Sequence, residues 1–423
     1  MELGIVGSGY VGTTVAACLA DAGHDVVNVD VDEQVVEAVN DGRSPIHEDG
    51  LDALVAAHAG DRLRATTEHA ALRDVDCVFL CLPTPSRDDG SIDLGPFASG
   101  VDAVAAALAG SDDPPIVVTK STVVPGTNEE VVVPALTDAV DDVAVVMNPE
   151  FLREGSAVAD FTDPDKVVVG GSDERALDVV ERVYEPVVDA ETPVVRTGLR
   201  EAETIKYANN VFLATKVSLV NDVGNVCKEL DVDTYEVMDA VGLDHRIGSA
   251  FLRSGLGWGG SCFPKDVDAF RAVARSEGYE PPVIDAAVTV NDGQPARMLD
   301  LLRRHVDVDG ARVAVLGLSF KPGTDDVRNS RALDLIDALV EAGADVVAHD
   351  PVAIGRARAV RDDVAYADEV GDALEGAEAA MIATGWPAYD DLDYAPMARS
   401  VVIDGRRVSV DHEALDVYEG LCW

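Results

Sequence analysis

The stretch Gly7-Ser8-Gly9-Tyr10-Val11-Gly12 decides the fold of the first part of the chain. It follows a short apolar run at residues 3–6 and precedes a helical pattern that runs to about residue 20. Glycines at this spacing, between a strand and a helix, allow a tight turn and let the pyrophosphate of a dinucleotide approach the helix N-terminus. The stretch therefore predicts a strand–helix–strand unit of the Rossmann type.

An acidic residue closes the predicted unit. The next apolar strand, residues 25–29, is followed by Asp30, which stands 18 residues after Gly12. A carboxylate at this place is suited to hydrogen-bond the adenosine ribose hydroxyls, and no arginine adjoins it to receive a 2′-phosphate. The sequence thus predicts NAD rather than NADP as the cofactor.

Polar clusters follow three further predicted strands. Residues 77–82 lead into Pro83-Thr84-Pro85, residues 116–119 into Lys120-Ser121-Thr122, and residues 143–147 into the acidic segment 148–155. Ligands of open parallel sheets bind at the carboxyl ends of strands, so these clusters predict a site. As single residues, Thr122 is equally well explained as a helix cap, and Glu150 and Glu154 as first-turn acids.

Residues 200–230 predict one long helix. The segment has no proline and one glycine, and its apolar residues recur near the helical period. Such a helix spans roughly 45 Å, which is enough to bridge two domains or to form a dimer seam. Lys206 and Asn210 are four residues apart and share one face.

A glycine-rich loop at residues 257–266 reads Gly-Trp-Gly-Gly-Ser-Cys-Phe-Pro-Lys-Asp. The glycines let the backbone approach a ligand or adopt positive φ. They deliver Cys262, three residues before Lys265, and a nearby ammonium group favours the nucleophilic thiolate. Taken alone, the loop is better explained as a turn with a buried structural cysteine.

A second Rossmann-type unit is predicted after this loop. A strand at residues 312–318, a loop at 319–328, a helix at 330–341 and a strand at 345–348 repeat the N-terminal order with a longer loop. Lys321 and Arg328 are suited to a diphosphate, and a last strand ends in Asp404-Gly405-Arg406.

The charge of the chain limits its partners. The 78 acidic and 33 basic residues give a net charge of −45, spread along all 423 residues. Nucleic acid and anionic membranes attract basic proteins, so the composition argues against both. We interpret the acidity as an adaptation to high salt, where charges are strongly screened. Only seven of the basic residues are lysines, so each lysine is a pointer to a specific role.

Other compositional features predict a cytoplasmic chain without metal. The six cysteines form no CxxC pair or zinc spacing, and the eight histidines are scattered. The first strand begins almost at Met1, which leaves no room for a signal peptide, and no apolar run reaches about 18 residues.

Together these stretches resemble the UDP-glucose/GDP-mannose dehydrogenase family across nearly the whole chain. The motifs that carry the resemblance are residues 7–12, 120–122 and 148–155, Lys206 with Asn210, and residues 259–266, 320–328 and 404–406. The resemblance implies an α/β fold with two Rossmann-like, doubly wound parallel-sheet domains joined by a long central helix. It implies an NAD-binding domain at residues 1–199, a helical dimerisation domain with the cysteine loop at 200–297, and a nucleotide-sugar domain at 298–423. A homodimer built on the central helix is expected.

The resemblance also implies a reaction, the NAD-dependent four-electron oxidation of a nucleotide sugar's primary alcohol to a carboxylate. For UDP-glucose the product is UDP-glucuronate. Cys262 is expected to hold the sugar carbon as a thiohemiacetal and then a thioester. Lys206 and Asn210 would stabilise oxyanions, Asp266 would position the lysine and water, and Glu154 with Thr122 would act as general base.

The resemblance assigns binding residues as well. Contacts with NAD are expected from Gly7, Gly9, Tyr10, Val11, Gly12, Asp30, Thr84, Pro85, Thr122, Lys265 and Arg328. Contacts with the nucleotide sugar are expected from Glu150, Phe151, Leu152, Glu154, Lys206, Asn210, Arg246, Gly259, Phe320, Lys321 and Arg406. Arg246 matches the arginine that reaches the neighbouring subunit's sugar.

Three alternatives stay open. The same chemistry on GDP-mannose or UDP-N-acetylmannosamine is hard to separate by motif. A single two-electron oxidation, as in hydroxyacid dehydrogenases of the 6-phosphogluconate type, leaves Cys262 idle. A non-catalytic nucleotide-sugar sensor has no need of a complete set of hydride acceptor, nucleophile and base.

Overall fold

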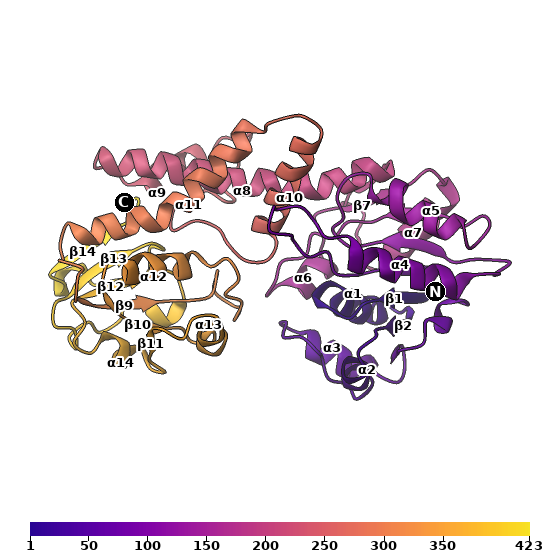
Figure 1. The fold of residues 1–423 in the computed structure, drawn as a ribbon, viewed down its shortest axis with the longest axis horizontal. Helices are drawn as coiled ribbons and strands as arrows, with labels where there is room; N and C mark the ends of the chain where they lie inside the picture. The colour runs from indigo at the N-terminus through magenta and orange to yellow at the C-terminus, as the bar shows by residue number, and fades with distance from the viewer. The chain divides into compact units, whose positions relative to one another are not determined.

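The computed structural model describes all residues, 1–423, and divides into two compact units (Figure 1). The first comprises Met1–Asn209 and the second Asn210–Trp423. The division falls inside one continuous helix, α8 (Leu199–Glu229), which the sequence predicts within a residue at each end. The expected three-part division at residues 199/200 and 297/298 stays a prediction.

The first unit is built on an eight-stranded sheet in the order β3-β2-β1-β4-β5-β6-β7-β8. All neighbouring strands are parallel except β6 and β7, which pair antiparallel. The strands are β1 (Glu2–Val6), β2 (Asp25–Val29), β3 (Leu63–Thr66), β4 (Cys77–Leu80), β5 (Ile116–Thr119), β6 (Val145–Met147), β7 (Val167–Gly170) and β8 (Val194–Thr197). The central strands are buried on both faces, which is why they appear in the sequence as continuous apolar runs.

Helices cover both faces of this sheet. Successive strand residues, such as Val78 and Phe79, belong to two different apolar clusters, as the two-residue period of a strand requires. One cluster includes residues of α1 (Tyr10–Asp21), α3 (Leu51–His58), α6 (Ala157–Thr162) and α7 (Glu174–Tyr184). The other includes residues of α4 (Gly95–Leu108) and α5 (Val133–Thr137). The short helix α2 (Glu33–Asn40) follows β2.

The second unit contains a six-stranded, fully parallel sheet in the order β11-β10-β9-β12-β13-β14. Its strands are β9 (Arg312–Leu316), β10 (Asp345–His349), β11 (Ala365–Tyr366), β12 (Ala379–Ile382), β13 (Val401–Asp404) and β14 (Val417–Gly420). Its helices are α9 (Thr234–Val241), α10 (Phe263–Ser276), α11 (Pro282–Arg303), α12 (Arg331–Glu341), α13 (Ile354–Val360) and α14 (Val370–Leu374). The strand order repeats that of the first unit, so the predicted doubly wound fold with two sheets is confirmed.

Neither α8 nor any other helix combines the length and the apolar character that a membrane-spanning segment needs.

Candidate active site

The glycine loop between β1 and α1 is fixed by its own packing at two positions. Gly7 adopts a φ of +96°, and a Cβ there would lie 2.4 Å from the Cys81 carbonyl oxygen. A Cβ on Gly12 would lie 2.0 Å from the Gly7 carbonyl oxygen. Asp30 braces the loop, because its carboxylate accepts a hydrogen bond of 2.6 Å from the Ser8 amide. Only glycine therefore fits at Gly7 and Gly12.

Gly9 is different, because nothing in the protein requires a glycine there. No protein atom lies within 4 Å of the position that its Cβ would take. Its backbone, with φ of −71° and ψ of −167°, is available to any residue. The open space in front of Gly9 and the half-buried Asp30 carboxylate fit the pyrophosphate and ribose of a dinucleotide. The residues present therefore fit NAD.

The polar clusters predicted at strand ends lie at the carboxyl edge of the sheet. Residues 81–85 follow β4, residues 120–122 follow β5 and residues 148–155 follow β6, and these three strands are neighbours. The Ser121 hydroxyl accepts a hydrogen bond of 2.7 Å from the Leu82 amide and so joins the first two clusters. Thr122 accepts a hydrogen bond on its carbonyl oxygen from the Tyr207 hydroxyl, at 3.4 Å.

A buried ion pair joins α8 to the segment after β6. The Lys206 ammonium lies 2.6 Å from the Glu150 carboxylate, and both side chains are less than a tenth exposed. Glu150 also accepts a hydrogen bond of 2.7 Å from the Leu152 amide. Burial raises the pKa of the Glu150 carboxyl more than any other single influence, but the Lys206 ammonium, the Leu152 amide and the charge of Lys120 together hold that pKa below its usual value. Glu150 is therefore an anion at neutral pH.

Three of the seven lysines converge on residues 148–151. Besides Lys206, Lys120 donates hydrogen bonds to the side-chain oxygens of Asn148 and Tyr184, at 2.9 and 3.0 Å. The Lys166 ammonium lies 4.2 Å from the centre of the Phe151 ring, and its positive charge is attracted to the π electrons of that ring. Lys166 belongs to none of the predicted motifs, although the scarcity of lysine in the chain points to a specific role for this residue too.

Lys166 contacts α8 and lies within the influence of the positive charge of Lys206. Its ammonium donates a hydrogen bond of 3.1 Å to the Asn209 side chain. Desolvation lowers the pKa of Lys166, Asp165 acts in the opposite direction, and the positive charge of Lys206 lowers the pKa further. In a chain of charge −45, this cation cluster is a local exception suited to anionic groups.

In the second unit, Cys262 stands at the N-terminus of α10. It is exposed, whereas the other five cysteines are buried, so the explanation as a buried structural residue is wrong. The Lys265 ammonium lies 2.7 Å from the Asp266 carboxylate. Asp266 in turn accepts a hydrogen bond of 2.6 Å from the Asn210 side chain. Asn210, Lys265 and Asp266 thus form one connected group.

The glycines of the cysteine loop serve close packing between two loops. A Cβ on Gly259 would lie 2.1 Å from the Asn329 carbonyl oxygen, and one on Gly260 would lie 2.8 Å from the Phe320 ring. The Arg406 guanidinium donates a hydrogen bond of 3.3 Å to the Gly257 carbonyl oxygen. The structure therefore brings Phe320 and Arg406 to the cysteine loop, from which the sequence separates them widely.

The remaining predicted arginines are held by neighbouring acids. Arg328 pairs with Asp326 at 2.6 Å, and Arg246 pairs with Asp244 at 2.5 Å. Both side chains are more than 60% exposed, which leaves them accessible to a ligand or a partner. Lys321 lies beside the ring of its neighbour Phe320, at 5.6 Å from the ring centre.

The second unit lacks an adenosine site of the Rossmann type. Asp350, at the end of β10, corresponds to Asp30 but is almost fully buried. Its carboxylate accepts hydrogen bonds from the amides of Leu318, Ser319, Val352 and Ala353, the Ser319 hydroxyl and the indole of Trp386. A ribose diol finds no accessible acceptor at this carboxylate, so a nucleotide must bind this unit differently.

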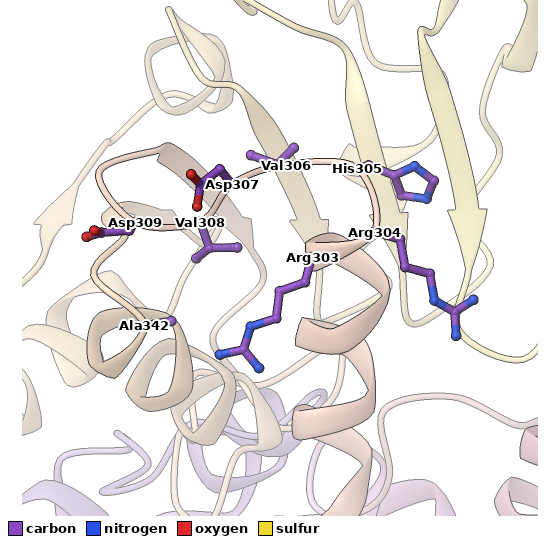
Figure 2. A pocket seen from close by; sticks show the side chains of 8 residues that line it. All are labelled: Arg303, Arg304, His305, Val306, Asp307, Val308, Asp309 and Ala342. Carbon is purple, nitrogen blue, oxygen red and sulfur yellow. The ribbon is translucent and has the colours of Figure 1, made fainter.

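A surface cavity of about 620 Å³ lies apart from these residues (Figure 2). It is lined by the C-terminal residues of α11, the turn at residues 305–309 and Ala342. None of the predicted site residues lines it. Arg303 and Arg304 stand at the C-terminal end of α11, where the helix dipole favours positive charge whether or not a ligand binds.

Comparison with known proteins gives matches over most of the chain. Residues 1–188, 200–293 and 314–411 match the NAD binding, central and UDP binding domains of the UDP-glucose/GDP-mannose dehydrogenase family. UDP-glucose 6-dehydrogenase AglM of Haloferax volcanii is 56% identical over 430 residues, with all of both chains covered. UDP-glucose 6-dehydrogenase of Rhizobium meliloti is 40% identical, with 96% of this chain and 95% of that protein covered. The structure of a UDP-glucose dehydrogenase from Pyrobaculum islandicum, 43% identical, superposes with a TM-score of 0.93 over 100% of this chain and 98% of that chain.

Proposed function

The chain belongs to the UDP-glucose/GDP-mannose dehydrogenase family, and we propose that it oxidises the C6 alcohol of UDP-glucose to the carboxylate of UDP-glucuronate. The observation that carries this proposal is the exposed Cys262 at the start of α10, in a chain whose other cysteines are all buried. NAD, when bound, accepts the hydride that the sugar carbon loses in each of the two oxidations.

Cys262 is the nucleophile in this proposal. Its thiolate adds to the C6 aldehyde formed by the first oxidation, which gives a thiohemiacetal. Loss of a second hydride converts that adduct into a thioester, and water then releases the carboxylate and returns the thiol. The position at the N-terminus of α10 supports this role, because the helix dipole favours negative charge on the sulfur.

Lys206 and Asn210 are the oxyanion-stabilising residues in this proposal. They lie one turn apart on α8, and each is held by a carboxylate, Lys206 by Glu150 and Asn210 by Asp266. Preorganised donors of this kind lower the barrier because they need not reorient when charge develops on the sugar oxygen. Removing one such donor typically costs about 3 kcal/mol of transition-state stabilisation.

Glu154, with Thr122, is proposed as the general base that takes the proton of the alcohol or of the hydrolytic water. The expected contacts divide between two nucleotides. Residues 7–12 with Asp30, Thr84, Pro85, Thr122, Lys265 and Arg328 would bind NAD. Residues 150–152 with Glu154, Lys206, Asn210, Arg246, Gly259, Phe320, Lys321 and Arg406 would bind the nucleotide sugar.

We further propose a homodimer formed through α8. Phe212, Leu219 and Val226 are spaced seven residues apart, and each is more than half exposed. A seven-residue apolar repeat on one helix is typical of a helix–helix interface, so a second copy of this chain is the proposed partner.

The three-domain division is also proposed, and the three separate family matches support it. A cytoplasmic location is proposed because all six cysteines are free thiols.

The stoichiometry of NADH formation with UDP-glucose tests the reaction. Two NADH per UDP-glucose are expected from the wild-type protein in high salt, and the Cys262→Ser protein should be unable to complete the conversion to UDP-glucuronate. One NADH together with an active Cys262→Ser protein would establish the two-electron alternative instead. Parallel assays with GDP-mannose and UDP-N-acetylmannosamine decide the sugar, and no NADH with any of the three would indicate a binding protein.

A further inference from the structure

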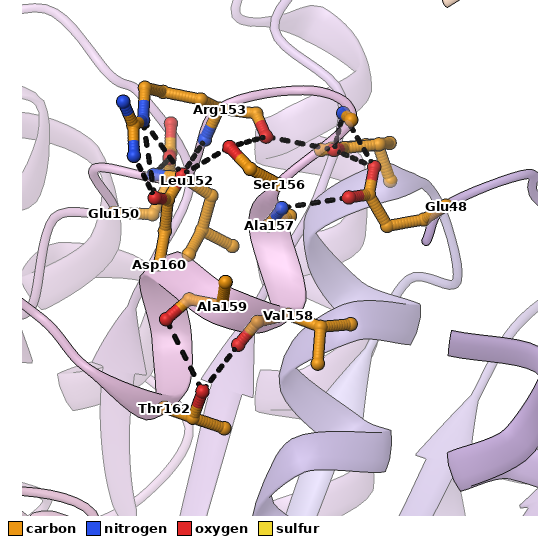
Figure 3. Close-up of polar contacts among 12 residues, drawn as sticks. Glu48, Glu150, Leu152, Arg153, Ser156, Ala157, Val158, Ala159, Asp160 and Thr162 are labelled. Carbon is orange, nitrogen blue, oxygen red and sulfur yellow. Dashed lines mark hydrogen bonds and ion pairs between the residues drawn. The ribbon is translucent and has the colours of Figure 1, made fainter. Parts of the chain in front are cut away.

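Glu48 is a buried carboxylate that belongs to none of the motifs above. It lies between α2 and α3 and is only 5% exposed. One of its carboxylate oxygens accepts a hydrogen bond of 2.8 Å from the Ala157 amide (Figure 3). The other accepts a hydrogen bond of 2.8 Å from the Gly155 amide. Two backbone amides thus hold a charge that would otherwise be costly to bury.

A third donor to Glu48 comes from the dinucleotide loop. The Tyr10 hydroxyl donates to the same carboxylate oxygen that receives the Gly155 amide. The Gly155 amide also lies 3.1 Å from the Tyr10 hydroxyl oxygen, so the three groups form one compact network. Burial and the adjacent Glu48 carboxylate raise the pKa of Tyr10, which keeps its phenol protonated and therefore a donor.

The segment held by this network carries Glu154. On one side of Glu154, the Arg153 amide donates a hydrogen bond of 2.8 Å to the Asp160 carboxylate (Figure 3). On the other side, the Gly155 amide is bound by Glu48. Asp160 fixes Arg153 within its own segment, whereas Glu48 connects this segment to Tyr10, whose backbone belongs to the glycine loop at residues 7–12.

We propose that Glu48 is a positioning residue that ties the dinucleotide loop to the Glu154 segment and so holds the general base in its working orientation. The proposal rests on the proposed function, because it assigns Glu48 a part in the reaction of that site. A purely structural role for Glu48 predicts only a loss of stability. The proposed role also requires that the loss of Glu48 disturbs the backbone on either side of Glu154 and slows the reaction more than another variant of equal stability does.

Three variants test the network, namely Glu48→Gln, Tyr10→Phe and their combination. Glutamine keeps the length of the side chain, but its amide nitrogen is a donor and must face a backbone N–H or the phenol. We expect kcat to fall about tenfold to a hundredfold in Glu48→Gln, since small misplacements of catalytic groups cost rates of this order. Tyr10→Phe should cost less, because both amide contacts with Glu48 remain. The combined variant should cost little more than Glu48→Gln alone, because both changes break one network.

Glu203→Gln is the matched control for the loss of a buried carboxylate. Glu203 is fully buried in the same unit and accepts hydrogen bonds from the Gly126 and Asn128 amides, at 2.5 and 2.8 Å. It should lower the thermal midpoint about as much as Glu48→Gln while keeping kcat within about threefold of wild type. Similar losses of kcat in both variants would overturn the proposal and leave Glu48 a structural residue.

Hydrogen exchange of the protein without ligands supplies a readout that needs no activity. Peptides that contain Gly155 and Ala157 should lose protection at least about tenfold in Glu48→Gln and keep it in Glu203→Gln. Unchanged exchange in Glu48→Gln would overturn the proposal. If the wild-type protein formed no NADH, the proposed function would fail, whereas the exchange result would still decide whether Glu48 holds this segment.

Discussion

Lys206 and Glu150 form a buried ion pair in the candidate site. Both side chains are buried, and burial raises the pKa of Glu150, but Lys206, helped by the Leu152 amide and Lys120, holds that pKa below its usual value. A carboxyl whose pKa is lower in the folded chain stabilises the fold above its unfolded pKa of about 4.3. That contribution disappears as the pH falls through the folded pKa.

We predict that Lys206→Met lowers the free energy of unfolding by about 3–5 kcal/mol at pH 7, because the buried Glu150 carboxylate loses the cation that pairs with it and keeps only the more distant charge of Lys120. The deficit relative to wild type should shrink as the pH is lowered to about 5, where the uncompensated carboxyl takes up a proton. Urea unfolding at a series of pH values measures both effects.

Two variants complete this test. Lys216→Met is the control, because Lys216 lies on the same helix and donates only to the Ile247 carbonyl oxygen at the chain's surface. The combined variant Glu150→Gln/Lys206→Met should recover most of the lost stability, since no unpaired charge remains. A pH-independent deficit that persists in the combined variant would show that packing, not charge, explains the loss.

Single residues divide into those that the sequence predicts and those that only contacts reveal. Cys262, Lys206 and Asn210 stand in recognisable motifs. Glu48 and Lys166 do not, because their roles depend on contacts with residues 155–157 and with Phe151, more than one hundred positions away for Glu48. Lys265, which the sequence predicts to favour the Cys262 thiolate, pairs with Asp266 in the structure.

At the scale of elements, the loop between β1 and α1 contains two kinds of glycine. Gly7 and Gly12 are required by the packing of the loop, whereas Gly9 faces the space expected to receive a ligand. Gly9→Ala should fold with a thermal midpoint within about 2 °C of wild type, since its Cβ meets no protein atom. Its affinity for NAD should fall at least about tenfold, because the methyl group enters the space that the pyrophosphate needs. Calorimetric titration with NAD measures the affinity.

Gly12→Ala is the contrasting variant. Its Cβ would approach the Gly7 carbonyl oxygen to 2.0 Å, so the loop must deform and the thermal midpoint should fall. Normal NAD affinity in a well-folded Gly9→Ala protein would mean that this loop does not receive the cofactor in the expected way.

The exposed apolar residues of α8 allow a test of the proposed dimer. Phe212→Glu places a charge on the seven-residue apolar repeat, so we predict that it shifts the protein from dimer to monomer in analytical ultracentrifugation. Val360→Glu introduces the same charge at an exposed apolar residue of α13 and should leave the assembly unchanged. A wild-type protein that sediments as a monomer would remove the basis for this prediction.

Helices, strands and loops likewise differ in how far the sequence predicts them. The buried strands β1, β2, β4 and β5 are apolar runs that the sequence predicts at the correct places. Strand β8 was not predicted, because it is an edge strand with mostly exposed residues and its apolar run is only two valines long. The glycines of the cysteine loop were predicted either to let the backbone approach a ligand or to adopt positive φ, and Gly260 does adopt a φ of +84°. The room at Gly259 and Gly260 is taken by Asn329 and Phe320, which no local pattern indicates.

At the scale of the whole molecule, the net charge of −45 is the dominant electrostatic feature. Attractive pairs exist, and Arg196 alone contacts Glu174, Asp178 and Glu181. Exposed pairs of this kind contribute little each, however, and 78 acids cannot all be matched by 33 basic residues. Repulsion among unmatched carboxylates therefore opposes the folded state, and salt should relieve it.

We predict that the thermal midpoint rises with KCl concentration from about 0.1 M to 2 M. The screening length falls from about 10 Å at 0.1 M to about 3 Å at 1 M, so repulsion between neighbouring carboxylates is weakened most at the lower concentrations. The variant Asp112→Asn/Asp113→Asn removes two adjacent exposed carboxylates and should raise stability by about 0.5 kcal/mol at 0.1 M but not at 2 M. If the midpoint did not depend on KCl, repulsion among the acids would be too weak to matter, and the acidic composition would need another explanation. If the midpoint rose but the variant gained equally at both concentrations, salt would stabilise the fold through its effect on hydration rather than through screening.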